Sequence, residues 1–89
     1  MRYSEDFIER VRSGNNIEDV ISGYVKLQRK GSSYMGLCPF HNEKTPSFSV
    51  HPARQTYHCF GCGASGDVFN FLMEYDKLSF QEAVRTLAV

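Results

Sequence analysis

The sequence has 89 residues, enough for one small domain. A chain of this size buries only about 60–65% of the surface that its unfolded form exposes, so an apolar core alone stabilises it marginally. Ten Lys and Arg residues balance ten Asp and Glu residues, and the formal net charge is zero. The overall charge therefore gives no indication of a nucleic-acid partner. Hydrophobic residues make up 42% of the chain and aromatic residues 13%, which excludes a disordered chain.

The sequence shows neither a targeting signal nor a membrane segment. The first six residues, MRYSED, carry charges where a secretory signal has an apolar run, and no run of about 18 apolar residues occurs anywhere. Three cysteines cannot form a closed set of disulfides within one chain. We therefore expect a reduced, cytoplasmic domain that has no membrane partner.

Residues 4–24 are predicted to form two short helices. Ser4 and Asn16 stand at the two N-cap positions, and acidic residues follow each of them in the first turn. Each helix has one apolar face, formed by Phe7, Ile8 and Val11 in the first and by Ile17, Val20, Ile21 and Tyr24 in the second.

Residues 25–63 contain segments in which apolar and polar residues alternate, which is typical of β-strands. We expect about four antiparallel strands between residues 25 and 60, the first of them starting at Val25. Residues 31–33 (GSS) are the predicted turn between the first two strands. Pro46 and Pro52 bracket the third strand, because proline cannot donate a hydrogen bond inside a sheet.

The helical pattern returns at residues 67–88. Asp67 is the predicted cap of a helix that runs to about Tyr75, and residues 79–82 (SFQE) have the form of a capping box for a last helix. The predicted fold is a small α+β domain spanning residues 1–89, with an antiparallel sheet flanked by short helices. Because the chain stops in or just after a helix, we expect it to be an N-terminal fragment of a longer chain.

Two pairs of metal-ligand residues are the most informative feature. Cys38 and His41 form one pair and Cys59 and Cys62 the other, each with two residues between the ligands, and seventeen residues separate the pairs. Four such ligands suit tetrahedral zinc, and because the protein fills every position, the predicted zinc is structural. Gly63 and Asn42 follow the two pairs, and both residue types accept the positive φ that a ligand turn tends to need.

Two other interpretations of these cysteines, a redox motif and a haem site, are less consistent with the sequence. A redox Cys-x-x-Cys requires a βαβ unit, and a c-type haem site requires His directly after the second Cys, where Gly63 stands. His58 and His51 are the alternative fourth ligands. The spacing favours His41, because His58 is adjacent to Cys59 and points to the other side of the strand.

The charges are unevenly distributed along the chain. Residues 26–54 carry a net charge of +4 and the rest −4, so the sheet region is basic and the helices are acidic. By strand alternation, one open sheet face would hold Lys26, Lys30, Ser47, Ser49, His51, Thr56 and His58, which suit contacts with phosphates and base edges. The alternative is a solvated face that is charged only for solubility, with the nearby aromatic residues in the core. The candidate DNA contacts are Lys26, Arg29, Lys30, Lys44, Arg54, His51, His58, Tyr34, Tyr57 and Phe60.

No catalytic site is expected. The sequence has no Gly-rich phosphate loop, no nucleophile paired with a base and no acidic cluster for magnesium. The apolar residues Phe69, Phe71, Leu72, Met73 and Phe80 are predicted to be core residues.

Residues 38–48 (CPFHNEKTPSF) and 57–63 (YHCFGCG) closely resemble the N-terminal zinc-binding domain of DnaG-type bacterial DNA primases. The resemblance covers nearly the whole chain, including residues 24–27 (YVKL) and 71–78 (FLMEYDKL). It implies a zinc-ribbon sheet flanked by helices, with zinc on Cys38, His41, Cys59 and Cys62.

The resemblance also implies a function. In these primases the domain binds single-stranded template DNA and helps select initiation sites for primer synthesis. It cooperates, in cis or in trans, with a TOPRIM-type RNA-polymerase domain that holds the catalytic acidic residues and magnesium, while a further domain docks on the replicative helicase. One departure matters: many members have a basic residue and Asn in the turn where this chain has Ser32 and Ser33, so its hairpin tip is less cationic.

Two other functions are compatible with the sequence. Zinc ribbons also serve as protein–protein adaptors, so the fold alone does not decide between a DNA-binding module and an interaction module. A further possibility is that the domain mainly contacts its own catalytic domain or a neighbouring primase, and this role is compatible with DNA binding.

Overall fold

The computed structural model describes residues 3–41 and 44–88, so the predicted role of Asn42 lies outside the described residues. Within the described residues, five strands and four helices follow one another in the order α1, α2, β1 to β5, α3, α4. Their bounds are α1 Glu5–Ser13, α2 Ile17–Ser22, β1 Gln28–Lys30, β2 Ser33–Gly36, β3 Phe48–His51, β4 Thr56–Cys59, β5 Ser65–Gly66, α3 Val68–Tyr75 and α4 Phe80–Leu87. The predicted α+β class with an antiparallel sheet is confirmed.

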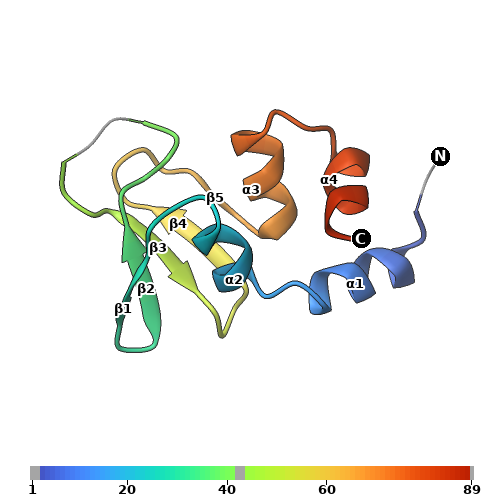
Figure 1. The fold of residues 1–89 in the computed structure, drawn as a ribbon, viewed down its shortest axis with the longest axis horizontal. Helices are drawn as coiled ribbons and strands as arrows, with labels where there is room; N and C mark the ends of the chain where they lie inside the picture. Colours follow the sequence, from blue (N-terminus) through green and yellow to red (C-terminus); the bar gives the residue numbers. More distant parts are fainter. Residues whose placement is uncertain (1–2, 42–43, 89) are drawn as a thin grey trace.

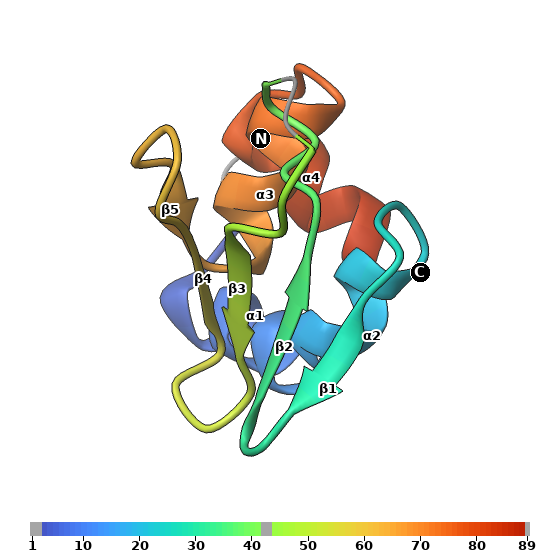
Figure 2. The same cartoon turned by 90° about the vertical axis from the view of Figure 1, so that its left-hand side faces the viewer.

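The five strands form one sheet in which each strand pairs antiparallel with the next strand along the chain. The helices all lie on one side of this sheet (Figure 1). After a turn of 90°, the strands lie side by side in front of the helices (Figure 2). The sheet therefore has one face covered by helices and one open face.

The number and start of the strands differ from the prediction. Pairing begins at Gln28, because the backbone N–H of Val25 still donates to the Ile21 carbonyl, as in a helix end. The fifth strand, Ser65–Gly66, pairs with Tyr57 and His58. It has no apolar alternation that would reveal it in the sequence. The predicted hairpin turn is confirmed, with Gly31 at φ +64° between β1 and β2.

The helix caps agree with the sequence at three of four predicted positions. Ser4 accepts a hydrogen bond from the N–H of Phe7, and full capping boxes form at Asp67 and Ser79. Asn16 occupies the N-cap of α2, but its side chain makes no capping hydrogen bond. Instead, the Oε1 atom of Gln55 accepts from the N–H of Ile17 at 2.8 Å. The β3–β4 turn therefore caps α2.

The core lies between the covered sheet face and the helices. Phe48, Tyr57 and Phe71 are at most 1% exposed, and their rings contact one another with centroids 5.4–6.3 Å apart. Burial raises the pKa of Tyr57 to about 12. The predicted core residues Phe69 and Leu72 are also buried, whereas Phe80 is 39% exposed and only packs its ring against Phe69.

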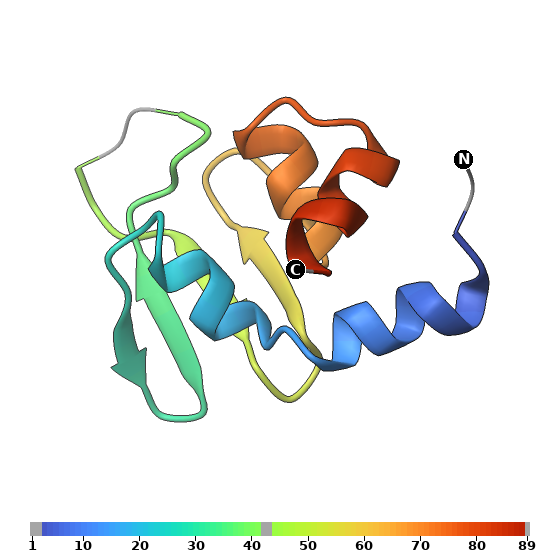
Figure 3. The same ribbon diagram turned by 45° about the vertical axis from the view of Figure 1, so that its right-hand side comes forward.

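Helix α1 runs away from the sheet along the edge of the α3–α4 pair (Figure 3). The side chain of Asn15 donates to the carbonyl of Leu87, and the Arg12 guanidinium lies 5.5 Å from the ring centroid of Phe69 and 3.5 Å from an oxygen of Asp67. These contacts attach the N-terminal helix to both C-terminal helices. None of the helices in the described ranges is long and apolar enough to cross a membrane.

Candidate metal centre and nucleic-acid interface

The two ligand pairs lie in loops at the same end of the sheet. Cys38 follows β2 and leads into the loop that holds His41, while Cys59 ends β4 and Cys62 lies in the β4–β5 turn. This turn is closed by two backbone hydrogen bonds, from Cys59 to Ala64 at 2.7 Å and from Gly63 to Cys59 at 2.8 Å. Because β2 and β4 both pair antiparallel with β3, they run in the same direction and end at the same edge. Cys38 and Cys59, which are 21 positions apart, therefore lie close together.

The four predicted ligands converge. The ligand atoms of Cys38, His41, Cys59 and Cys62 all lie within 4.8 Å of one another. The Sγ atoms of Cys38 and Cys62 are 3.8 Å apart. Two sulfurs at Zn–S distances of about 2.3 Å in a tetrahedron are separated by about 3.8 Å, so this spacing fits one zinc ion. Three thiolates and one imidazole are also a donor set that zinc prefers.

The surroundings shift the pKa values of Cys38 and Cys59 in opposite directions. The pKa of Cys38 is raised to about 12, mainly by burial; the neighbouring thiols contribute to the rise, and a hydrogen bond from the Phe40 N–H opposes it. Burial also disfavours ionised Cys59, but hydrogen bonds from the Ser47 hydroxyl and the N–H groups of Cys62 and Gly61 outweigh it and lower the pKa to about 7. A bound divalent cation offsets the repulsion among the thiolates.

Two residues of the metal centre were missed by the sequence analysis of ligands. Gly61 has no space for a side chain, because an added Cβ would lie 2.9 Å from His41 Nε2 and from Ser47 Oγ. A glycine between two cysteine ligands was a signal for this close approach. Ser47 was predicted to lie on the open face, but its hydroxyl is 3.6 Å from Cys59 Sγ, and no sequence pattern indicates this contact. The positive φ of Gly63, +81°, agrees with the prediction.

The alternative histidine ligands lie elsewhere. His58 pairs with Ser49 across β3 and β4, on the open face of the sheet, and is not part of the cluster. His51 lies on the same face, where its Nδ1 and Nε2 atoms are 3.1 and 3.2 Å from the hydroxyls of Ser33 and Ser49. The structure thus brings together the four residues that the spacing favours.

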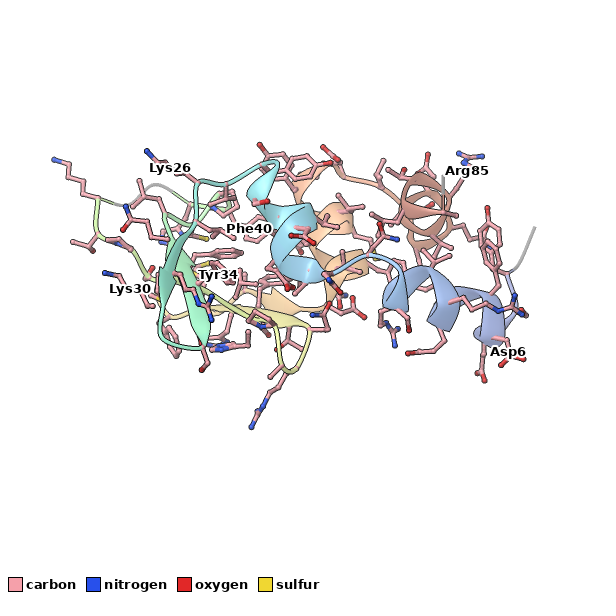
Figure 4. The ribbon with its side chains drawn as sticks, turned by 60° about the horizontal axis from the view of Figure 1, so that its bottom comes forward. Asp6, Lys26, Lys30, Tyr34, Phe40 and Arg85 are labelled. Atoms are coloured by element: carbon pink, nitrogen blue, oxygen red, sulfur yellow. The ribbon has the colours of Figure 1, made fainter. Side chains whose placement is uncertain are left out.

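The open face carries part of the predicted DNA-contact set. The strand pairings place Gln28, Lys30, Ser33, Met35, Ser49, His51, Thr56, His58 and Ser65 on it. The lysines Lys26 and Lys30 project from the sheet end of the molecule, whereas Asp6 and Arg85 lie at the helical end (Figure 4). Lys44 and Arg54 are exposed.

Three of the predicted DNA contacts are not on this face. Tyr57 is 1% exposed and packs in the core, so its ring is not available for stacking on a base. Tyr34 pairs with Val50, shares the covered face and packs against the core. Arg29 pairs with Tyr34, so it faces away from Lys30, and it donates to the Gly31 carbonyl at 3.1 Å. The alternation of strand residues explains all three positions.

Two hollows include residues of the open face. One, of about 720 Å³, is lined by His51, Arg54, Thr56, His58, Phe60 and Ser65. The other, of about 500 Å³, lies over β1 and β2, with Lys26 and Lys30 beside the apolar residues Tyr24, Met35, Leu37 and Pro39.

A family model described as the CHC2 zinc finger matches residues 3–89. The chain is 55% identical over 87 residues to a DNA primase of Listeria monocytogenes and 56% identical over 87 residues to a DNA primase of Geobacillus stearothermophilus. In both cases the match covers 98% of this chain, but only 14% and 15% of the relatives. The chain thus spans about a seventh of the length of these relatives.

A solved structure agrees with this match. It is described as the Aquifex aeolicus primase with its zinc-binding and RNA-polymerase domains. It superposes on this chain with a TM-score of 0.88 and 45% sequence identity, covering 92% of this chain and 20% of that one.

Proposed function

The chain belongs to the CHC2 zinc finger family, and from this premise we propose that it is the zinc-stabilised, single-stranded-DNA-binding module of a DNA primase. In this proposal the module holds the template while a separate catalytic domain makes the primer, and so it helps to select where synthesis starts. The observation that carries the proposal is the open sheet face, on which exposed cations and an exposed aromatic ring lie beside hydrogen-bonding side chains.

The first part of the proposal is one structural zinc ion on Cys38, His41, Cys59 and Cys62. The ion would fix the β2–β3 and β4–β5 loops and thereby the ends of the open face. Binding energies of about 10–16 kcal/mol are typical of such sites, which is as large as the whole net stability of a typical domain, about 5–15 kcal/mol. We expect native mass spectrometry to show one zinc per chain. Removing it with a chelator should collapse the dispersed NMR spectrum, and an unchanged spectrum would contradict a structural role.

The second part is the binding of single-stranded DNA. Phosphates would contact the cations at the sheet end, where Lys26 and Lys30 lie far from the acidic Asp6 (Figure 4). Each phosphate contact contributes about −0.7 to the slope of log affinity against log salt concentration for a single strand. An affinity that does not change with salt concentration would exclude binding through phosphate contacts.

A charge-reversal pair tests the site directly. The K26E/K30E variant should lose most of its affinity for single-stranded DNA. The K77E/R85E variant changes the net charge equally but at exposed positions outside the open face, so it should bind nearly as well as the unmodified chain. Equal losses in the two variants would mean that net charge, and not this face, governs binding.

The remaining parts of the proposal concern the parent protein. It would be a nucleotidyltransferase whose catalytic domain, with its magnesium, acts with this module in cis or in trans, and other parts of it would contact the replicative helicase. It would work in the cytoplasm, where the three thiols stay reduced.

The hollow over β1 and β2 supports a second candidate, an interaction module that binds protein. Tyr24 and Leu37 are 40% and 48% exposed there, and exposed apolar side chains are typical of partner surfaces. A protein partner that binds through the apolar residues of this hollow should be lost on replacing Leu37 by Asp.

A further inference from the structure

The hollow over β1 and β2, which we call the β1–β2 groove, has two chemically different sides. One side is formed by Lys26 and Lys30, on β1 and the segment that leads into it. The other side is formed by Met35, Leu37 and Pro39, on β2 and the segment that follows it. Because β1 and β2 pair antiparallel and alternate side chains share a face, a basic row and an apolar row lie side by side along the groove.

The basic row has no counter-charge in the described part of the chain. Lys26 and Lys30 are exposed, and the ion pairs within residues 3–41 and 44–88 all involve Arg12, on helix α1. None of the described residues that line the groove is acidic. Both lysines lie at the sheet end of the molecule, far from Asp6 (Figure 4). An acidic ligand would therefore meet two cations whose charge the described residues leave uncompensated.

The apolar row favours a peptide over a nucleic acid. Leu37 is 48% exposed in it. Tyr24 is the only aromatic residue among the described ones that line the groove, and its ring already packs against Phe71 and Tyr75, with centroids 5.6 and 4.8 Å apart. Bases stack on free aromatic rings, and their polar edges stay unpaired against aliphatic side chains. An apolar side chain of a peptide would instead be removed from water there, which is favourable.

The spacing of the two rows suits an extended peptide. Neighbouring strands lie about 4.8 Å apart, whereas a helix with its side chains is about 10–12 Å wide, so a helix is too broad to lie between the rows. An extended chain directs successive side chains to opposite sides. Acidic residues at alternate positions would therefore face Lys26 and Lys30, while the apolar residues between them would face Leu37.

We propose that the β1–β2 groove docks an extended segment of a partner protein in which acidic and apolar residues alternate. The acidic side chains pair with Lys26 and Lys30, and the apolar side chains pack against Met35 and Leu37. This inference rests on the second candidate function, the interaction module, and names the chemical class of its partner. Because the proposed DNA site uses the same two lysines, such a segment displaces single-stranded DNA from the sheet end.

The test uses the zinc-loaded chain and a ten-residue probe peptide in which Asp alternates with Val. Binding is followed by NMR shifts at peptide concentrations up to the millimolar range. Two matched probes change one property each: Asn replaces every Asp in the first, and Ser replaces every Val in the second. Because the probes leave the chain unchanged, this comparison does not depend on the folding of any variant.

The Asp–Val peptide should shift the backbone signals of residues 26–30 and 35–39, and both matched probes should bind at least about 5-fold more weakly. With single-stranded DNA already bound, the Asp–Val peptide should release the DNA and the Asn–Val probe should not. Probes that bind alike would overturn the inference, because neither charge nor apolar contact would then select the ligand.

Variants of the chain locate the site, each compared at full zinc content. K26E/K30E should bind the Asp–Val peptide about 5-fold or more weakly, whereas K77E/R85E, with the same change in net charge, should bind nearly as well as the unmodified chain. Leu37→Asp should weaken binding by about 10-fold, whereas Phe7→Asp changes an exposed ring outside the groove and should keep the affinity. Equal losses in a variant and its control would place the peptide elsewhere.

Failure of this inference is distinguishable from failure of the proposed function. If the chain binds oligonucleotides with the expected salt dependence but shows no peptide-dependent shifts in the groove, the inference is wrong and the DNA-binding module stands. If it binds the Asp–Val peptide but no oligonucleotide, the DNA-binding module is wrong and the inference stands. Self-association of the free chain that Leu37→Asp abolishes would assign the groove to a second copy and overturn the inference.

Discussion

Gln55 gives the sharpest test of how the fold supports the open face. It lies in the turn between β3 and β4, and its side chain accepts from the N–H of Ile17 at 2.8 Å and donates to the Pro52 carbonyl at 2.8 Å and to Glu18 Oε1 at 3.2 Å. Its φ is +55°, in the left-handed region. The residue therefore joins helix α2 to the turn at considerable backbone strain.

Replacing Gln55 by Ala should lower the free energy of unfolding by about 2 kcal/mol. The lost helix cap contributes about 1 kcal/mol and the two other hydrogen bonds about 0.5 kcal/mol or more each. A change of this size lowers the Tm of a domain this small by roughly 10 °C. Replacing Gln55 by Gly removes the same contacts but relieves about 1–2 kcal/mol of strain at a cost of about 0.4–1 kcal/mol in chain entropy, so this variant should be the more stable of the two.

Thermal and urea unfolding at a fixed excess of zinc measure these differences. Asn16→Ala is the matched control, because Asn16 holds the N-cap position without a capping hydrogen bond. It should change stability by less than about 0.5 kcal/mol. If Asn16→Ala proved more harmful than Gln55→Ala, or Gln55→Gly less stable than Gln55→Ala, the contacts and the strain assigned to Gln55 would be wrong.

Two further predictions concern the metal centre and the core. Gly61→Ala should weaken zinc binding in a chelator competition, because the added Cβ would lie 2.9 Å from His41 Nε2. The control Gly23→Ala, whose added Cβ has its closest contact at 3.4 Å, should keep the zinc affinity. Equal zinc affinities of the two variants would refute the close approach of Gly61 to His41. Tyr57 should be the last tyrosine to ionise: because burial raises its folded pKa from 10.0 to about 12, the stability that it contributes is full below pH 10 and is lost as the pH rises towards 12. A phenolate absorbance titration in which Tyr57→Phe removes an early step, and not the last one, would contradict its burial.

Most of the metal centre could be predicted from the sequence. Ligand spacing of two residues is a local property, and it selected Cys38, His41, Cys59 and Cys62, which the structure brings within 4.8 Å. Gly63 was predicted for the same reason, because its positive φ belongs to a single turn. Ser47 was not, because it approaches Cys59 from the neighbouring strand.

The open face could be predicted only in part. Alternation along a strand correctly separates His58 from Cys59 and Lys30 from Arg29, but it does not say which face the helices cover. For this reason Tyr57 was expected at the DNA interface and is found in the core. The exposure of Phe60 was likewise decided by the turn that carries it.

The sequence by itself determined the α+β class, the helix caps at Ser4, Asp67 and Ser79, and the four-ligand metal centre, because each depends on residues close together in the chain or on a fixed ligand spacing. Only the tertiary structure decided the cap of α2, the strand at residues 65–66 and which face of the sheet the helices cover. Each of these depends on contacts between segments that sequence patterns do not relate, such as Gln55 and Ile17, 38 residues apart.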